Sequence, residues 1–303
     1  MLWILAGPTA SGKSALALEL SALLPLEIVS ADSMQVYRGM DIGTAKPSAG
    51  ERARVPHHLI DVCDPDGSYD VCRFAQEALT AIADIRRRGK MPLVVGGTGL
   101  YIRALTHGIA DQLPRDAGLR ESLERQSVAE LQEELSSMGE HGLNASDFHN
   151  KRRLIRAVEI CRLTGQSLVA ARPRQEWKTP REPYRLFFLN RPSGELHRRI
   201  EQRVEAMFAA GLEEECRRLL ERFPAKNPTA FQALGYRQVA GLLAGEMTRE
   251  QCVALVKIRT RQFARRQEQW FRRESALEKI SPGSETDPGR IVEYLKKRIQ
   301  ADA

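Results

Sequence analysis

The sequence predicts an α/β fold, with a doubly wound parallel sheet, an inserted α-helical domain and C-terminal helices. Three observations in the 303 residues predict it. Short apolar segments alternate with helical ones through the first third, and a glycine-rich turn joins the first apolar segment to a helix. After about residue 117 the sequence becomes charged and helix-periodic, before an apolar segment returns near residue 185. Such alternation with short buried strands is typical of a parallel sheet.

The first third is expected to supply strands and helices in turn. Residues 3–6, 27–30 and 92–95 are short apolar runs, which predicts buried strands. A helix is expected at residues 13–24, directly after the glycine-rich turn. Another is expected at residues 74–88, which are amphipathic, end in basic residues and are followed by a glycine.

The rest of the chain is expected to be mainly helical. Residues 119–138 and 150–164 are interpreted as helices of an insertion, and residues 171–185, with three prolines, as a connector. Residues 185–190, with Leu-Phe-Phe-Leu at their centre, predict a return to the sheet. The C-terminal helices are expected at residues 194–223, 235–244, 249–273 and 290–299.

These patterns set the expected domains and their charge. The core is predicted in two parts, residues 1–116 and 184–303, around an inserted helical domain at residues 117–183. Residues 1–112 hold 11 Lys/Arg and 12 Asp/Glu, whereas residues 113–303 hold 35 and 27. The excess positive charge therefore lies after the first third, which favours a polyanionic partner for that part or, more simply, a basic solvated surface.

The composition indicates a reduced, cytoplasmic protein. No run approaches the roughly 18 apolar residues of a membrane helix, and no secretory signal pattern is present at the start. The five cysteines form no Cys-x-x-Cys pair, and an odd, scattered set is typical of free thiols. The spacing of the nearby histidines and cysteines, His57, His58, Cys63 and Cys72, matches no structural zinc pattern.

A phosphate-binding loop (P-loop) is the strongest local motif. Residues 7–14, Gly-Pro-Thr-Ala-Ser-Gly-Lys-Ser, fit the pattern G-x-x-x-x-G-K-[ST] between a predicted strand and a predicted helix. Glycines let backbone N–H groups face phosphate oxygens, and the helix N-terminus adds positive potential. Lys13 supplies a full charge, and the Ser14 hydroxyl is suited to ligate Mg²⁺.

The second half of an NTPase site is missing from its expected place. The apolar strand at residues 92–95 ends in Gly-Gly-Thr-Gly, without the Mg²⁺-ligating aspartate of a motor-type NTPase. Asp32 instead follows the strand at residues 27–30, at the sheet edge where open α/β sheets bind ligands. An aspartate there can take a proton from a nucleophile. The residues therefore predict a group transferase, in which either a hydroxyl attacks a γ-phosphate or a nucleophile attacks carbon and expels diphosphate.

Longer motifs connect the sequence with a family. The segments that carry the likeness run in order along most of the chain: residues 30–47, 56–61, 95–101, 153–159, 234–237 and 260–267, with Trp270. Together they resemble tRNA dimethylallyltransferases, which are also called tRNA isopentenyltransferases. No Cys or His follows residue 273, so the chain resembles the bacterial form without a C-terminal zinc module.

The resemblance implies transfer of a dimethylallyl group from dimethylallyl diphosphate to N6 of adenine 37 of tRNA, with release of diphosphate. It implies Asp32, Thr98 and Lys13 as catalytic residues, with Asp32 as the base, and Mg²⁺ on Ser14 as the cofactor. The alternative for Asp32 is a helix cap or an ion-pair partner. The expected diphosphate-binding residues are those of the loop: Gly7, Pro8, Thr9, Ala10, Ser11, Gly12, Lys13 and Ser14.

The resemblance also implies contacts with the tRNA anticodon stem-loop, whose target base must be flipped out to react. The implied tRNA-binding residues are Asp32, Ser33, Met34, Gln35, Thr98, Arg120, Arg152, Arg153, Leu154, Ile155, Arg156, Gln232, Ala233, Leu234, Gly235, Tyr236, Arg237, Arg265, Arg266, Gln267, Trp270 and Arg272. Independently, residues 257–273 hold seven basic residues against one acidic, with three aromatics. In the alternative interpretation, some of these aromatic side chains are buried in the core, and Phe263 is the first candidate.

Three rival functions remain at this point. An adenylate dimethylallyltransferase shares the loop and the chemistry but takes a free nucleotide, so it should not need the basic helices. A small-molecule kinase of the P-loop type is the second, and a noncatalytic tRNA-binding protein is the third. The chain is expected to be a monomer, because it shows no sustained heptad pattern.

Overall fold

The computed structural model describes residues 1–108, 113–171, 180–223, 228–274, 276–281 and 288–301. The chain forms two compact units, one made of Met1–Thr106 with Pro180–Ala303 and the other of His107–Thr179. Because the chain leaves the first unit and returns to it, the second unit is an insertion in the first. The predicted insertion at residues 117–183 overlaps this second unit, and residues 172–179 of the predicted connector lie outside the described residues.

A parallel sheet forms the centre of the first unit. Within the described residues it has six strands in the order β3-β2-β4-β1-β5-β6, and every neighbouring pair is parallel. The strands are β1 Leu2–Ala6, β2 Leu26–Ala31, β3 His57–His58, β4 Met91–Gly96, β5 Tyr184–Leu189 and β6 Leu277–Ile280. Strand order and chain order differ, so the connections cross over the sheet as a doubly wound fold requires.

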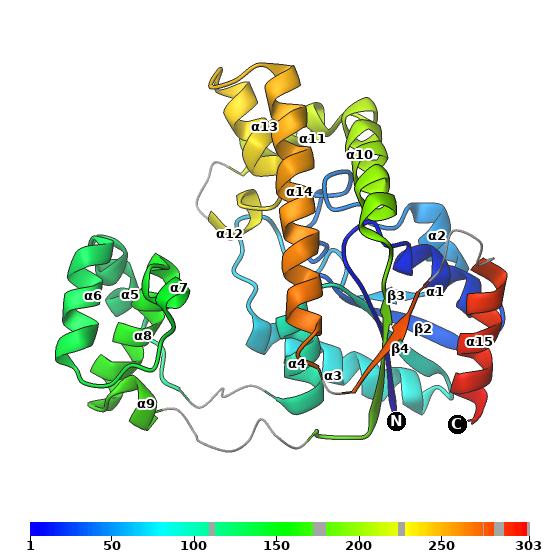
Figure 1. Ribbon diagram of the computed structural model, residues 1–303, viewed down its shortest axis with the longest axis horizontal. Helices are drawn as coiled ribbons and strands as arrows, with labels where there is room; N and C mark the ends of the chain where they lie inside the picture. The colour runs from blue at the N-terminus through cyan, green and yellow to red at the C-terminus, as the bar shows by residue number, and fades with distance from the viewer. Residues whose placement is uncertain (109–112, 172–179, 224–227, 275, 282–287, 302–303) are drawn as a thin grey trace. The chain divides into compact units, whose positions relative to one another are not determined.

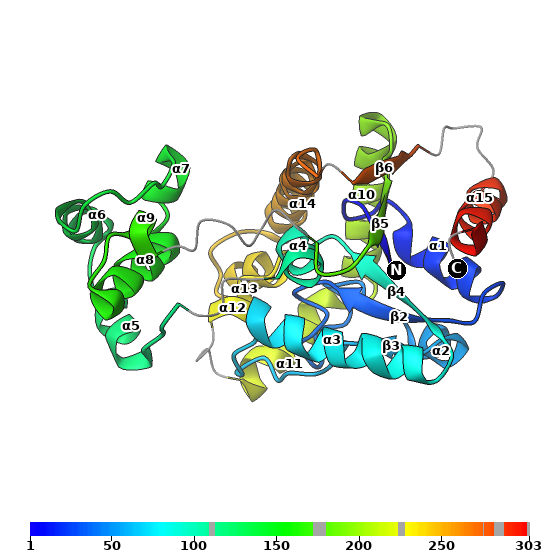
Figure 2. The same ribbon diagram turned by 90° about the horizontal axis from the view of Figure 1, so that it is seen from below.

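Helices cover both faces of the sheet (Figures 1 and 2). The helices of this unit are α1 Lys13–Ser21, α2 Ala49–Arg54, α3 Val71–Arg87, α4 Gly99–His107, α10 Ser193–Ala209, α11 Leu212–Arg222, α12 Pro228–Phe231, α13 Tyr236–Leu243, α14 Arg249–Phe271 and α15 Pro288–Ala301. Side chains of β1 alternate between the faces. Ile4 packs in a cluster with α3, α10 and α14, whereas Trp3 and Leu5 pack with α1 and α15. This arrangement confirms the predicted α/β fold.

None of the helices in the described residues is both long and apolar enough to span a membrane.

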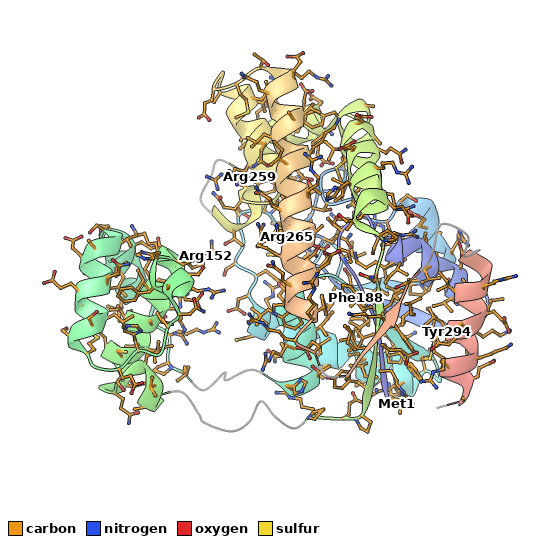
Figure 3. All side chains as sticks on the ribbon, in the orientation of Figure 1. Met1, Arg152, Phe188, Arg259, Arg265 and Tyr294 are labelled. Atoms are coloured by element: carbon orange, nitrogen blue, oxygen red, sulfur yellow. The ribbon has the colours of Figure 1, made fainter. Side chains whose placement is uncertain are left out.

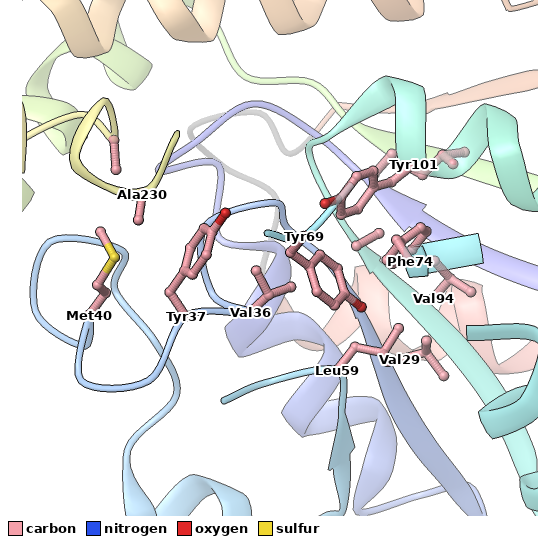
Figure 4. Packing of buried hydrophobic residues seen from close by; sticks show 14 of the residues in the cluster. Val29, Val36, Tyr37, Met40, Leu59, Tyr69, Phe74, Val94, Tyr101 and Ala230 are labelled. Carbon is pink, nitrogen blue, oxygen red and sulfur yellow. The ribbon is translucent and has the colours of Figure 1, made fainter. Parts of the chain in front are cut away.

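Buried aromatic rings anchor the segments that follow β2 and β4 (Figure 4). Tyr37 and Phe74 are fully buried, and the Phe74 ring stacks on Tyr101 with 3.8 Å between the centroids. Tyr37 comes five residues after Asp32, and Tyr101 comes three residues after Thr98. The core therefore fixes the two loops that carry the predicted catalytic side chains.

Two predicted helices are each divided in the structure. The single helix expected at residues 194–223 is wrong, because Gly211 adopts a φ of 96° between α10 and α11 and breaks the helical path. The segment at residues 119–138 contains α5 Ala117–Glu124 and α6 Val128–Ser137. Ser127 and Glu130 form a capping box that starts α6 anew. The two-residue strand β3, the short strand β6 and helix α2 were not predicted.

The second unit is a small helical bundle with its own core. It contains α5, α6, α7 Ala145–Phe148, α8 Lys151–Thr164 and α9 Leu168–Ala171. Leu123, Leu131 and Leu154 are fully buried in its apolar cluster. Helix α8 ends at Gly165, which adopts a left-handed conformation.

One carboxylate is buried in this bundle. Glu159 of α8 is 0% exposed, and it accepts hydrogen bonds from Arg120 at 2.7 Å, Arg156 at 2.6 Å and the Asp116 N–H at 3.0 Å. Burial opposes ionisation of Glu159, but these donors outweigh it and hold the pKa of the carboxyl below its ordinary value. Arg120 and Arg156, both expected at the tRNA, are thus partners of a buried acid within this unit.

Replacing Glu159 by glutamine is expected to destabilise the second unit by about 2 kcal/mol, since a buried charged network loses its acceptor while its arginines stay partly solvated. Because the folded pKa is lowered, this stabilisation is present above the ordinary carboxyl pKa and is lost as the pH falls through the folded value. Hydrogen exchange of α8 in the full chain measures the effect. Glu121→Gln, at an exposed pair with Arg125, is the control. Equal protection in both variants would contradict the expectation.

Candidate active site

The phosphate loop joins β1 to α1 as the motif predicts. Gly12 adopts a φ of 98° at the start of α1, and Ala10 also has a positive φ, of 63°. A Cβ at Gly7 would lie 2.9 Å from Ser11 Oγ and 3.0 Å from the Leu189 carbonyl oxygen, so only glycine fits there. These conformations bend the backbone around the N-terminus of α1, where N–H groups are free of helical partners.

Lys13 lies beside two other charged side chains of the same cavity, Asp32 and Arg203. Its Nζ donates to the Pro8 carbonyl at 3.1 Å. Burial lowers the pKa of Lys13 to about 8, although the carboxylate of Asp32 acts in the opposite direction. Burial also lowers the pKa of Arg203, again against Asp32. Two desolvated cations and one carboxylate leave a net positive site, which favours an anionic ligand.

The affinity for inorganic diphosphate is expected to fall as the pH rises above about 8. Lys13 is protonated below that pKa and becomes neutral above it, so its attraction for the anion is lost on the alkaline side. Ionisation of diphosphate itself acts in the opposite direction. Calorimetric titrations between pH 7 and pH 10 would measure this, and a constant or increasing affinity over that range would contradict it.

Two further arginines hold the loop from outside, and sequence reasoning missed both. Arg199 of α10 donates from Nε to the Ala10 carbonyl at 2.8 Å, and Arg191, just after β5, donates to the Ser11 carbonyl. Arg191 also pairs with Glu195. Arg199 and Arg203 are four residues apart, so they lie on one face of α10. That spacing is the sequence signal for Arg199 and Arg203, but many surface helices share it, so it does not identify them.

Asp32 and Thr98 lie together at the carboxyl ends of β2 and β4. The Thr98 Oγ1 accepts the Ser33 N–H at 3.1 Å, and the Thr98 N–H donates to the Ala31 carbonyl at 3.2 Å. Asp32 is half-buried, and its Oδ1 accepts the Met34 N–H at 2.9 Å. A Cβ at Gly96 would lie 2.2 Å from the Ala31 carbonyl oxygen, which explains the glycine after β4. The fold thus places the predicted base in the same cavity as the phosphate loop.

The opposite wall is a loop held by a buried acid. Glu215 of α11 accepts the N–H groups of Ile42 and Gly43 and the Tyr236 hydroxyl, the last at 2.5 Å. Gln35 donates to the carbonyls of Thr44 and Ala45, both at 3.3 Å. These bonds shape the loop after β2 around the cavity. Tyr236 was predicted as a tRNA contact, but its side chain is 0% exposed and supports this loop instead.

The cavity has a volume of about 410 Å³ and is partly open to solvent. One end is charged, with Lys13, Asp32 and Arg203, and Ser14 also lines it. The rest of the lining combines polar and charged side chains, among them Lys46, Glu51, His57 and Arg266, with an apolar set: Ala17, Leu18, Ile28, Val95, Val204, Met207, Val256 and Phe263. Such a cavity suits a small ligand with an anionic head and an apolar body.

Helix α14 has a basic face and an inward face. Arg259 and Arg265 project from it (Figure 3), and Arg265 and Arg266 are exposed. Phe271 is fully buried against Phe188, whereas Phe263 is half-buried at the cavity. The expectation that Phe263 would be the first aromatic to be buried is therefore wrong, because the helix turns Phe271 into the sheet-side core.

The other predicted tRNA-binding residues differ in exposure. Within the second unit, Arg152 and Arg153 are exposed, whereas the side chains of Leu154 and Ile155 belong to its core. In the first unit, Gln232, Arg237 and Arg272 are exposed. The remaining positions there are buried or half-buried: Ser33, Met34, Gln35, Thr98, Ala233, Leu234, Gly235, Tyr236, Gln267 and Trp270. Several of these line the cavity rather than the open surface.

The described residues contain no group of three or more His, Cys, Asp or Glu side chains that could hold a metal ion. All five cysteines are described and are free thiols. At the loop, the Ser14 hydroxyl is an oxygen ligand that a cation could share with oxygens of a phosphate ligand.

Fold and site together define a P-loop α/β transferase, whose cavity combines the phosphate loop, the Asp32 carboxylate and apolar side chains. The family model described as IPP transferase matches residues 35–274. The chain belongs to this IPP transferase family, the tRNA dimethylallyltransferases, as its sequence motifs predicted.

Relatives and solved structures agree with this assignment. The chain is 44% identical to tRNA dimethylallyltransferase 1 of Citrifermentans bemidjiense over 96% of both chains, and 46% identical to the tRNA dimethylallyltransferase of Thermus thermophilus over 89% of both. It resembles the crystal structure of a full-length tRNA isopentenylpyrophosphate transferase from Bacillus halodurans with a TM-score of 0.71, at 34% identity and 99% and 97% coverage. A eukaryotic dimethylallyltransferase acting on tRNA gives a TM-score of 0.82 at 26% identity, covering 99% of this chain and 79% of the other.

Proposed function

We propose that the protein transfers a dimethylallyl group from dimethylallyl diphosphate to N6 of adenine 37 in tRNA and releases diphosphate. The observation that carries the proposal is the cavity in which Lys13 and Arg203 face Asp32 beside an apolar wall. Dimethylallyl diphosphate has the matching shape, a charged head on a five-carbon apolar group. Membership of the tRNA dimethylallyltransferase family supports tRNA as the acceptor.

The residues have complementary roles in this reaction. The lone pair of an adenine amino group is delocalised into the ring, so N6 is a weak nucleophile. Asp32 accepts the N6 proton as the N6–C1 bond forms, and the C1–O bond breaks towards the phosphate loop. Lys13, Arg203 and the N–H groups of the loop stabilise the charge that gathers on the departing diphosphate. The apolar wall binds the allyl chain and excludes water from it.

Mg²⁺ is the cofactor that the loop motif implies, and the donor set fits it. Ser14 is exposed at the N-terminus of α1 and lines the cavity, and Mg²⁺ commonly combines few protein oxygens with phosphate oxygens and water. Ser14 and the diphosphate oxygens would hold the ion, which supplies charge neutralisation on the leaving group. Lys13 and Arg203 bind and orient the diphosphate, whether or not the ion is bound.

The acceptor base reaches the cavity only when it is flipped out of the anticodon loop. The exposed basic face of α14, with Arg265 and Arg266, is suited to follow the phosphates of the flanking nucleotides. Arg152 and Arg153 offer a second basic surface on the insertion. We propose that the protein acts as a monomer in the cytoplasm, and the free thiols support the second part of that proposal.

One assay tests the proposed function against its rivals. The protein is incubated with labelled dimethylallyl diphosphate, Mg²⁺ and either undermodified tRNA or AMP. Label in tRNA alone supports the proposal, whereas label in AMP alone would indicate an adenylate dimethylallyltransferase. Absence of label with consumption of added ATP would indicate a kinase, and tRNA binding without either reaction would indicate a noncatalytic protein.

Replacing Arg265 and Arg266 together by glutamine is expected to weaken tRNA binding and to lower the slope of log affinity against log salt by about 1–2, since each phosphate contact releases close to one counterion. Binding is measured at several salt concentrations. Lys90→Gln with Lys297→Gln, at two exposed positions outside the cavity, removes the same charge as a control. An unchanged slope in the arginine variant would show that this face does not contact phosphates.

A further inference from the structure

Gln267 joins two loops of the active site through one buried amide. Its side chain lies on the inward face of α14, and the residue is 8% exposed. The Thr9 N–H donates to Gln267 Oε1 at 2.8 Å, and Gln267 Nε2 donates to the Gly97 carbonyl at 2.9 Å. Both ends of the amide are therefore used, one on the phosphate loop and one on the turn after β4.

The turn after β4 is shaped to receive this helix. A Cβ at Gly97 would lie 2.2 Å from Gln267 Nε2, and a Cβ at Gly99 would lie 2.2 Å from Trp270. Real Cβ atoms do not approach neighbours so closely, so Gly97 requires glycine while the Gln267 amide keeps its place, and Gly99 requires glycine while the Trp270 ring does. The Gly-Gly-Thr-Gly sequence is thus explained by contact with α14 as well as by the end of the strand.

The joined loops carry the reacting groups in the proposed function. Thr9 belongs to the loop that faces the diphosphate, and Gly97 precedes Thr98, which holds the Ser33 N–H beside Asp32. A change in the separation of these loops would alter the distance between the base and the leaving group. Misplacement by about 1 Å can cost about 10²-fold in rate. The Thr9 N–H is also already bonded to Gln267, so it is not available to a phosphate oxygen in this conformation.

We propose that Gln267 is a positioning residue that keeps the diphosphate loop in register with the turn carrying Thr98. This inference rests on the proposed function and replaces the tRNA contact that family resemblance implies for Gln267. Both ends of this buried amide are bonded inside the protein, which leaves at most one N–H and one oxygen lone pair for another partner, whereas its exposed neighbours Arg265 and Arg266 present charges.

The test compares Gln267→Met with Gln269→Met, an equivalent change at an exposed position on the same helix. Inorganic diphosphate with Mg²⁺ is titrated calorimetrically into each full-length variant, and kcat and the KM for undermodified tRNA are measured with dimethylallyl diphosphate. For Gln267→Met, diphosphate affinity is expected to fall about 3–10-fold and kcat about 10–100-fold, with the KM for tRNA within about twofold. Gln269→Met should keep the diphosphate affinity and kcat of the unaltered protein.

A raised KM for tRNA with unchanged kcat and diphosphate affinity would overturn the inference, because that pattern marks an RNA contact. If the methionine variant does not fold, Gln267→Glu keeps the acceptor for Thr9 and loses the donor to Gly97. Its diphosphate affinity and kcat should then be intermediate, and wild-type values would overturn the inference. If the unaltered protein binds diphosphate but does not label tRNA, the proposed function is refuted. The inference about Gln267 is still tested in that case, because the diphosphate affinities of the variants can be compared.

Discussion

Replacement of Asp32 by asparagine is expected to lower kcat for tRNA alkylation about 10²–10⁴-fold, the usual contribution of a positioned general base. Asparagine keeps the size of the side chain and an oxygen for the Met34 N–H, which Asp32 Oδ1 accepts at 2.9 Å. It cannot take the N6 proton. The loss should therefore appear in kcat, while the affinity for tRNA stays close to that of the unaltered protein.

Single-turnover kinetics with saturating substrates measure this loss directly, and gel-shift titration measures tRNA affinity in parallel. Asp66→Asn, at an exposed position away from the cavity, provides a control for a lost carboxylate. Near-normal turnover of Asp32→Asn would exclude Asp32 as the base. A loss confined to tRNA affinity would instead make Asp32 an RNA contact.

Asp32 and the phosphate loop were predictable because both depend on local rules. The glycine pattern of the loop specifies its own conformation, and the structure shows positive φ values at Ala10 and Gly12. Asp32 follows an apolar strand, and in a parallel sheet the carboxyl ends of strands meet at one edge. Since β2 and β1 both pair with β4, the two motifs meet across a single strand.

The arginines around the loop were not predictable in this way. Arg191, Arg199 and Arg203 follow β5, and the two that contact the loop lie 180 and 189 residues after their partners in it. Their role depends on β5 pairing with β1, which brings the start of α10 over the loop. Sequence spacing shows only that Arg199 and Arg203 share a helix face, and many surface helices have that pattern.

The family motifs picked out residues that matter, but they did not show whether each one contacts tRNA or the protein core. Leu154 and Tyr236 were expected at tRNA, yet both are 0% exposed. Tyr236 instead donates to Glu215 and accepts the Gly43 N–H, so it supports the wall of the cavity. A motif is retained in sequence for packing as readily as for binding, and only burial and hydrogen bonding separate the two.

Replacing Lys13 by methionine is expected to lower kcat/KM for dimethylallyl diphosphate about 10²–10³-fold, as for removal of one donor that stabilises a developing anion. Methionine retains the apolar stem and removes the charge that Lys13 places in the cavity. Lys90→Met, at an exposed position, is the control. The variant also tests the origin of the pH effect, because it removes Lys13, whose pKa of about 8 is expected to set the pH dependence of diphosphate affinity. Its weaker diphosphate affinity should therefore no longer fall between pH 8 and pH 10. If the fall persists in Lys13→Met, or if diphosphate affinity changes less than about twofold, the charge that binds diphosphate lies on another residue, and Arg203 is the next candidate.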